Sequence, residues 1–197
     1  MPATFLVSDT HFGHAGVCKF THPDDPTVKL RPWTDPAEMD EEMIRRWNDR
    51  VRPSDKVYHL GDVVINRKAL KTLSRLNGDK VLIRGNHDIF RDDEYRQYFR
   101  ELRAYHVMNG MILSHIPVHS DSLGRFGTNI HGHTHANRVM LPGFNGKITD
   151  IVDTRYHCVC VEQTDFAPIL FEDVVRRIEA EGGTIGFQNG NGTTQVT

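Results

Sequence analysis

Five short apolar runs, each followed by residues able to bind a metal ion, constrain this chain more than any other feature. The runs begin at Thr4, Lys56, Lys80, Met111 and Thr128. Apolar runs of this length that end at glycine or polar residues predict buried β-strands. Because ligands of α/β sheets gather beyond the carboxyl ends of the strands, the side chains that follow these runs are expected to converge on one site.

The residues after these runs are carboxylates, an amide and imidazoles. The set is Asp9, His11, Asp62, Asn86, His115, His133 and His135. Taken singly, each has an ordinary structural explanation: Asp9 could cap a turn, and His115 could be a core histidine. Together they offer nitrogen and oxygen donors without a thiolate, which suits Mn²⁺, Fe or Zn²⁺. Seven candidate ligands exceed the four of a closed structural zinc site, so two metal ions are expected.

The spacing within the blocks supports the same site. Asp9 and His11, like His133 and His135, are separated by one residue. In an extended chain such residues point to the same side, so each pair is expected to present two ligand atoms together. In three blocks a glycine precedes the ligand-type residue. Glycine is expected where the backbone turns sharply or approaches a ligand closely. These glycines are Gly61, Gly85 and Gly132.

Helix-period segments lie between several of the predicted strands. Asp35-Pro36-Ala37-Glu38 predicts a capped helix start, and apolar residues then recur at helical spacing up to Val51. Three further stripes predict helices: Ala69, Leu70, Leu73 and Leu76; Tyr95, Tyr98, Phe99 and Leu102; and Phe171, Val174, Val175 and Ile178. The chain becomes strand-rich after Asn109, which predicts an α/β (α+β) fold with mixed sheets.

Length and charge set wider limits. The 197 residues fit one domain, and a formal charge of −2 indicates neither a nucleic-acid nor a membrane partner. No apolar stretch approaches the ~20 residues needed to span a bilayer, and the amino terminus does not resemble a signal peptide. Cys18, Cys158 and Cys160 are expected to be buried, reduced thiols. A cytoplasmic location is therefore expected.

The blocks resemble those of the calcineurin-like metallophosphoesterase superfamily, in particular a small bacterial or phage-type branch. They stand in the family's order and read Asp9-Thr10-His11, Gly61-Asp62, Gly85-Asn86-His87-Asp88, His115 and Gly132-His133-Thr134-His135. The resemblance implies a four-layer β-sandwich of mixed sheets flanked by helices, which we place at residues 1–185. The asparagine- and glycine-rich end predicts a flexible C-terminal tail at 186–197.

The resemblance also implies roles for individual residues. Asp9, His11, Asp62 and His135 would hold one metal ion, and Asp62, Asn86, His115 and His133 the other. Two such cations lower the pKa of a bridging water, whose hydroxide attacks phosphorus. His87 would protonate the leaving group, and Asp88 would orient His87 or support the ligands. Mn²⁺ is the expected ion, with Fe, Zn²⁺ or Ni²⁺ as alternatives.

The substrate is less constrained. A phosphodiester of the nucleotide or nucleic-acid type is expected, with a phosphomonoester as the alternative. A catalytically silent protein-interaction scaffold of the same fold is the rival from another class. His14 is a candidate phosphate contact or a surface turn residue, and Arg84 a substrate contact or part of a strand. His157 stands where the family would carry Asn, and neither its role nor the oligomeric state follows from the sequence.

Overall fold

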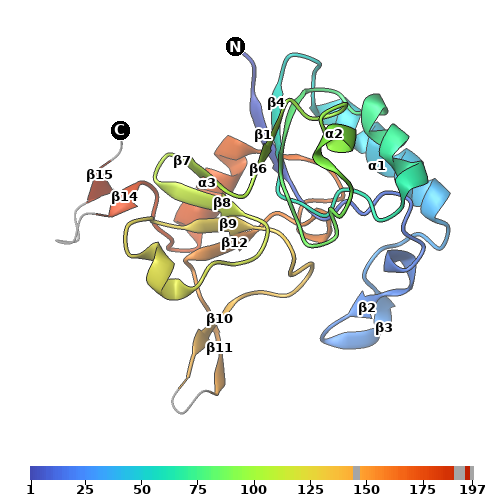
Figure 1. The fold of residues 1–197 in the computed structure, drawn as a ribbon. Coiled ribbons are helices and arrows are strands. Elements are labelled where there is room, and N and C mark those ends of the chain that lie inside the picture. Colours follow the sequence, from blue (N-terminus) through green and yellow to red (C-terminus); the bar gives the residue numbers. More distant parts are fainter. Residues whose placement is uncertain (144–146, 189–193, 196–197) are drawn as a thin grey trace.

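The computed structural model describes residues 1–143, 147–188 and 194–195, and two mixed sheets form its centre (Figure 1). The first sheet has five strands in the order β13-β1-β4-β5-β6. Their bounds are β1 Thr4–Val7, β4 Lys56–His59, β5 Asp79–Ile83, β6 Glu101–Arg103 and β13 Ile169–Leu170. The first four of these run parallel, and β13 pairs antiparallel with β1.

The second sheet has four strands in the order β12-β9-β8-β7. Their bounds are β7 His106–Met108, β8 Met111–Ser114, β9 Asn129–His131 and β12 Tyr156–Cys158. Strands β8, β9 and β12 run parallel, and β7 is antiparallel to β8. The prediction of mixed sheets flanked by helices is therefore confirmed.

Two apolar clusters hold these layers together. One lies between the helices and the five-stranded sheet, where Trp47 and Leu73 meet Val57. The other contains residues of both sheets, among them Leu6 of β1 and Ile130 of β9. Strands β1, β4 and β5 each supply side chains to both clusters, so these three runs read as continuously apolar.

The helices follow two of the four predicted stripes closely. Helix α1 (Pro36–Arg50) begins as predicted, because the Asp35 carboxylate accepts the Ala37 amide hydrogen bond at 2.9 Å. Helix α3 (Phe171–Ala180) buries Phe171, Val174 and Ile178. The stripe that begins at Ala69 lies on a 3₁₀ helix, η2 (Arg67–Arg75).

The predicted helix through Tyr95 and Leu102 is wrong. Helix α2 (Asp92–Tyr95) ends after one turn, and Leu102 lies in β6. A single further turn, in which the Phe99 amide donates to Tyr95 O, suffices to bury Phe99. The Arg100 amide then donates to Lys80 O at 2.9 Å, so pairing with the sheet overrides the helical spacing.

Short hairpins and 3₁₀ turns complete the described chain. The strands are β2 Thr21–His22, β3 Asp25–Lys29, β10 Met140–Pro142, β11 Ile148–Val152, β14 Phe187–Gln188 and β15 Thr194–Gln195; the turns are η1 Val17–Lys19, η3 Ser120–Leu123 and η5 Val161–Gln163. Phe187 of the predicted tail bridges Phe126, whereas 189–193 and 196–197 lie outside the described residues. None of the described helices has the length and apolar character to cross a membrane.

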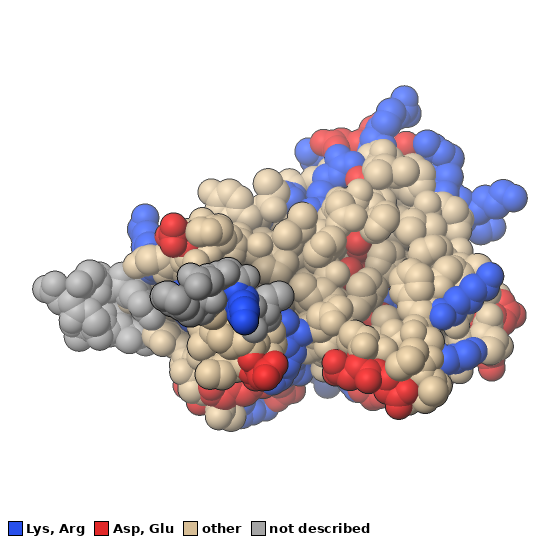
Figure 2. All heavy atoms as spheres, turned by 90° about the horizontal axis from the view of Figure 1, so that it is seen from below, with Lys and Arg blue, Asp and Glu red and all other residues tan. Residues whose placement is uncertain are grey.

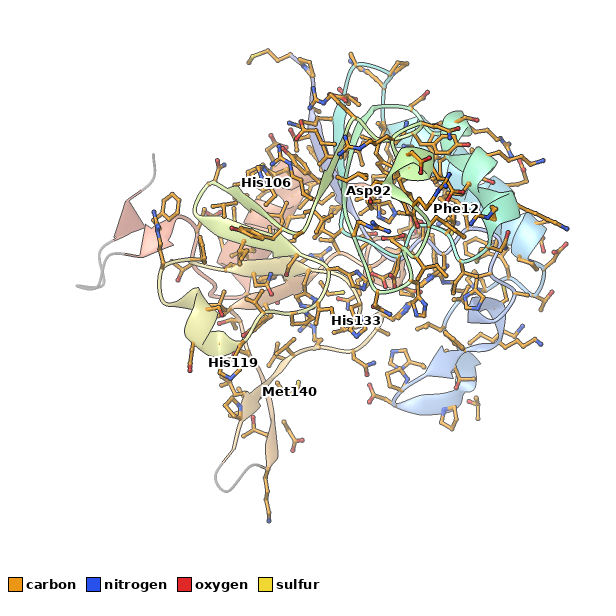
Figure 3. The ribbon with its side chains drawn as sticks, viewed as in Figure 1. Phe12, Asp92, His106, His119, His133 and Met140 are labelled. Carbon is orange, nitrogen blue, oxygen red and sulfur yellow. The ribbon has the colours of Figure 1, made fainter. Side chains whose placement is uncertain are left out.

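The two sheets meet where their parallel strands end. Ser8, just after β1, forms a parallel bridge with Cys160, just after β12, and its amide donates to Val159 O at 3.0 Å. This bridge brings the loops that follow β1, β4 and β5 against those that follow β8 and β9. Figure 3 shows His133 at this junction, below the two sheets.

Candidate metal centre

Six of the seven predicted ligands form two groups at the junction. Asp9, His11 and His135 make one group, and Asp62, His115 and His133 the other; within each group the candidate ligand atoms lie within 4.8 Å of one another. Asp62 joins the groups, because its Oδ2 lies 3.8 Å from His11 Nε2 and 3.5 Å from His115 Nε2. The Oδ1 of the seventh, Asn86, lies 2.9 Å from His115 Nε2.

The backbone is left-handed, not extended, at five of the seven candidate ligands. Positive φ angles occur at Asp9 (58°), His11 (50°), Asp62 (58°), His133 (68°) and His135 (51°). The expectation that an extended chain aligns each pair is therefore wrong. Such backbone costs about 1–3 kcal/mol per residue and persists only where the surroundings fix it. Bonds between loops do so here, for the amides of Asp9 and His11 donate to Gly61 O and Asp62 O at 3.0 and 3.1 Å.

The three glycines are required by close approach. A Cβ at Gly132 would lie 2.0 Å from Ser8 Oγ and 2.5 Å from Asp9 Oδ2. One at Gly85 would lie 2.2 Å from Asp62 Oδ1. Gly61 has a φ of +96°, and its Cβ would lie 2.6 Å from His115 Nδ1. Any side chain at these positions would displace a candidate ligand.

The hydrogen bonds of two histidines direct a lone pair into the site. His115 Nδ1 lies 2.8 Å from Leu60 O, and His135 Nδ1 lies 2.9 Å from Glu162 Oε1. Since both partners are acceptors, each Nδ1 carries the proton, and each Nε2 is left as a donor atom for a cation. His115 Nε2 then faces the Asn86 oxygen, so two hydrogen-bond acceptors lie opposite each other. A cation between these two atoms would stabilise the arrangement.

Asp9 supplies the clearest test of whether a cation fits. Its Oδ2 accepts hydrogen bonds from Ser8 Oγ (2.6 Å) and the His133 amide (2.8 Å). Its Oδ1 is buried without a hydrogen-bond partner among the described residues, and lies 3.7 Å from the Nε2 atoms of His11 and His135. Burial raises the pKa of this carboxyl, but His11 and the neighbouring histidines outweigh it and hold the pKa below its usual range. A buried, ionised and unpaired oxygen among imidazoles fits a bound divalent cation.

Two buried charged residues, Arg31 and Glu162, support the group that contains His135, and the sequence did not predict this role. Glu162 binds His135, and Arg31 binds Glu162 at 2.6 Å, with side chains that are 2% and 0% exposed. Arg31 also donates to Asp9 O at 2.7 Å and Thr10 O at 2.9 Å. Burial raises the pKa of Glu162, but the Arg31 charge and the contacts with His135 together outweigh this effect and lower the pKa. Only the fold brings these two residues, 131 positions apart, into contact.

The two predicted catalytic residues differ in exposure. His87 is exposed, its ring lies 5.7 Å from that of His11, and its amide donates to Asp62 Oδ1 at 2.8 Å. Asp88 is buried, and its carboxylate accepts from the amides of Asp62, Gly85 and Val63 at 2.8–3.0 Å. Asp88 thus joins the loops after β4 and β5 through their backbones.

The two candidate substrate contacts, His14 and Arg84, lie in different surroundings. The half-buried His14 ring is 5.8 Å from the His11 ring, at the edge of the site. The Arg84 guanidinium binds the loop after His87, through Asp92 (2.6 Å) and the carbonyls of Asp88 and Phe90. His157 is buried against Thr154 O at 3.1 Å. The three cysteines are free and buried, as predicted.

The surface around the site is mixed. The buried residues of the site are Asp9, His11, Asp62 and His115. The centre reaches solvent at the exposed residues Asn86, His87 and His133. Seen from below, uncharged side chains cover most of the middle of this face, and charged ones gather around its rim (Figure 2). The described residues form no continuous basic track across the middle of the face shown in Figure 2.

Comparisons with known proteins agree with this geometry. A family model described as calcineurin-like phosphoesterase matches residues 4–149. An uncharacterised protein of Methanocaldococcus jannaschii, MJ1445, is 36% identical over 184 residues, which cover 91% of this chain and 93% of that protein. The crystal structure of a protein of unknown function, AQ665 from Aquifex aeolicus, is similar with a TM-score of 0.62 and 25% identity, over 90% of this chain and 100% of that one.

Proposed function

Because the chain belongs to the calcineurin-like phosphoesterase family, we propose that it hydrolyses phosphodiesters of the nucleotide type with two divalent cations. The observation that carries the proposal is the position of Asp62, whose Oδ2 lies within 4 Å of a ligand nitrogen from each of the two groups. One carboxylate can then serve two neighbouring ions. Mn²⁺ is the ion we expect, since the donors are nitrogen and oxygen only.

The ligands divide between the two ions as the groups suggest. Asp9, His11, Asp62 and His135 would hold one ion, and Asp62, Asn86, His115 and His133 the other. When bound, such a pair of ions activates water, orients phosphate oxygens and offsets the charge that develops on them. The protein's part is to fix these ligands before the substrate arrives, which the left-handed backbone and the loop-to-loop bonds do.

His87 is the residue we propose as the proton donor to the leaving oxygen. It is exposed at the open side of the centre, so its ring nitrogens can reach a bound ester. The bond from its amide to Asp62 Oδ1 couples its place to the bridging carboxylate. Asp88 acts as a positioning residue, because its carboxylate binds backbone amides of both loops.

The test uses metal-stripped protein to which Mn²⁺ is restored, with bis(p-nitrophenyl) phosphate as substrate and p-nitrophenyl phosphate as the monoester comparison. Asp62→Asn should reduce turnover at least ~100-fold and lower the bound manganese measured by elemental analysis. Asp121→Asn, which changes a carboxylate whose side chain is 90% exposed, is the matched control and should behave as wild type. Full turnover in Asp62→Asn, or no turnover with any divalent ion, would refute the proposal. Faster monoester cleavage would assign the alternative substrate class.

A further inference from the structure

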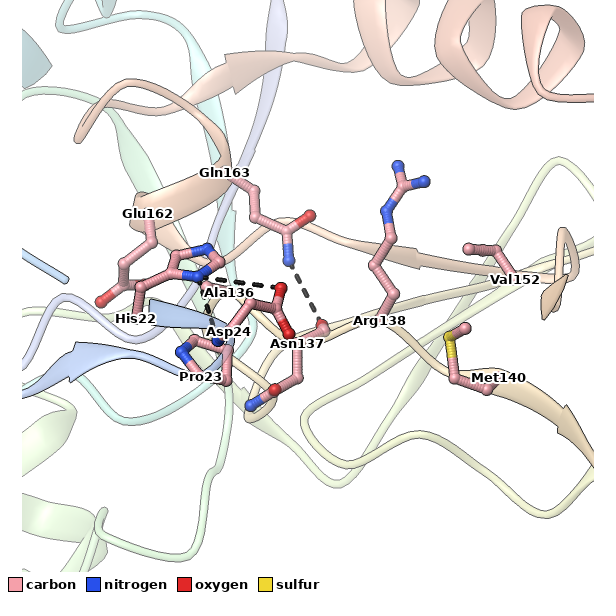
Figure 4. Close-up of a pocket in the computed structure, with 10 residues that line it drawn as sticks. All are labelled: His22, Pro23, Asp24, Ala136, Asn137, Arg138, Met140, Val152, Glu162 and Gln163. Carbon is pink, nitrogen blue, oxygen red and sulfur yellow. Dashed lines mark hydrogen bonds and ion pairs between the residues drawn. The ribbon is translucent and has the colours of Figure 1, made fainter. Parts of the chain in front are cut away.

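A cleft of about 580 Å³ opens beside the proposed metal centre (Figure 4). The β2–β3 hairpin forms one wall with His22 and Asp24, and the segment after His135 forms another with Asn137 and Arg138. Glu162 and Gln163 line it as well. The volume lies within the roughly 300–1,000 Å³ typical of small-molecule sites.

Two contacts connect the cleft to the metal centre. Glu162 lines the cleft and binds Nδ1 of His135, so the cleft begins one residue beyond a proposed ligand. Phe20 directly precedes β2, is 45% exposed, and its ring lies 6.5 Å from the His135 ring and 6.3 Å from the His14 ring. A partly exposed aromatic ring therefore lies beside the proposed centre, two residues before His22 of the cleft lining.

The charges of the lining indicate which chemistry the cleft accepts. The Asp24 carboxylate lies 3.8 Å from His22 Nδ1. Glu162 is bound by Arg31, and Arg138 donates to Glu181 at 3.1 Å. Among the described residues that line the cleft, Arg138 is the one Lys or Arg, and it is already paired, so a second phosphate is disfavoured. The Asn137 amide, His22 and the apolar side chains of Met140 and Val152 suit a flat, uncharged group that forms hydrogen bonds.

The cleft is lined by neighbours of His135 and not by the proposed proton donor. The His135 ring stacks on the His11 ring at an interplanar angle of 12°, whereas His87 meets the same ring edge-on at 68°. Since His87, the proposed donor to the leaving oxygen, does not line the cleft, a group held in the cleft is the one that remains on the phosphate after cleavage.

We propose that this cleft, together with Phe20 beside His135, binds the nucleoside that stays attached to the phosphate product. The proposal rests on the proposed phosphodiesterase function and gives it a substrate class. The base stacks on Phe20 or enters the cleft beside it, and Asn137 offers hydrogen bonds to its edge. The cleft, and not the metal centre, then discriminates between esters.

The test compares two diesters with one leaving group, methyl p-nitrophenyl phosphate and the p-nitrophenyl ester of thymidine 5′-phosphate, on Mn²⁺-loaded protein. Wild type should favour the thymidine ester in kcat/KM by about tenfold or more. Phe20→Ala and Asn137→Ala should remove most of this preference while the methyl ester is cleaved within about twofold of the wild-type rate. Tyr105→Ala, another exposed aromatic, in the β6–β7 connection, is the matched control and should keep the preference.

The outcomes separate the two proposals. Equal kcat/KM for both esters in the wild type, or an unchanged preference in Phe20→Ala and Asn137→Ala, would overturn the nucleoside cleft and leave the phosphoesterase function standing. If neither ester is cleaved, the proposed function fails, and binding of thymidine 5′-monophosphate measured by NMR decides about the cleft. Binding that Phe20→Ala weakens would support it, and no binding would overturn it.

Discussion

Replacing Arg31 with Met should destabilise the fold by about 3–5 kcal/mol, because it leaves the Glu162 carboxylate buried without its cation. The side chain of Arg31 is 0% exposed and that of Glu162 is 2% exposed, so water cannot replace the lost partner. Two carbonyls, Asp9 O and Thr10 O, lose a charged donor as well. At about 2–4 °C per kcal/mol for a chain of this size, the melting midpoint should fall by ~6–20 °C.

Urea denaturation of metal-free protein measures this loss without any contribution from bound ions. Arg176→Met is the matched control, since this exposed arginine pairs with Asp173 on the surface of α3, and it should change stability by no more than about 0.5 kcal/mol. The double variant Arg31→Met with Glu162→Gln should lose less than the sum of the single losses, by about 0.5–3 kcal/mol. Additive losses, or a loss below about 1 kcal/mol for Arg31→Met, would show that the buried pair is not coupled as the geometry indicates.

Three further perturbations have defined outcomes. Gly132→Ala should abolish manganese binding because its Cβ would lie 2.0 Å from Ser8 Oγ, whereas Gly124→Ala, whose nearest neighbour is 3.8 Å away, should bind normally; elemental analysis compares them. Burial lowers the pKa of His59 to about 3. Because the unfolded chain, with a pKa of about 6.5, binds that proton more tightly, stability should fall by up to ~1.4 kcal/mol per unit as pH drops from about 6.5 toward 3. His59→Gln should have a shallower slope in urea titrations, and an identical slope would contradict this assignment. Mn²⁺ at about 100 times its Kd should add ~2.7 kcal/mol to wild-type stability, and an equal gain in Asp62→Asn would argue against binding at this centre.

Much of the architecture follows from local sequence. Helix α1 begins where the Asp35-Pro36 cap predicts, since the capping bond involves residues two positions apart. The five apolar runs predicted strands correctly, because a strand that is buried on both faces carries apolar side chains at successive positions. The helix predicted from the stripe at Tyr95 was wrong, because a single turn buries the same few residues as a long helix would. Pairing of the following residues with the sheet ends the helix after that turn.

The identity of the candidate ligands was also readable in the sequence, but the reason for their alignment was not. An extended chain would place Asp9 and His11 on one side; the structure uses left-handed backbone held by partners in other loops. Those partners, at Gly61 and Asp62, lie about fifty positions away. Backbone strain of this kind depends on the surroundings, so no local rule predicts it.

The sequence by itself determined the strands, the main helices, the donor types and the glycines that make room for them, because each depends on residue chemistry and short-range spacing. Only the tertiary structure decided that Arg31 and Glu162 hold His135, that Phe20 stands beside the centre and that a cleft opens next to it. The Glu162–His135 bond spans 27 positions and the Arg31–Glu162 pair spans 131. Such contacts form only when the sheets pack and meet at the Ser8–Cys160 bridge.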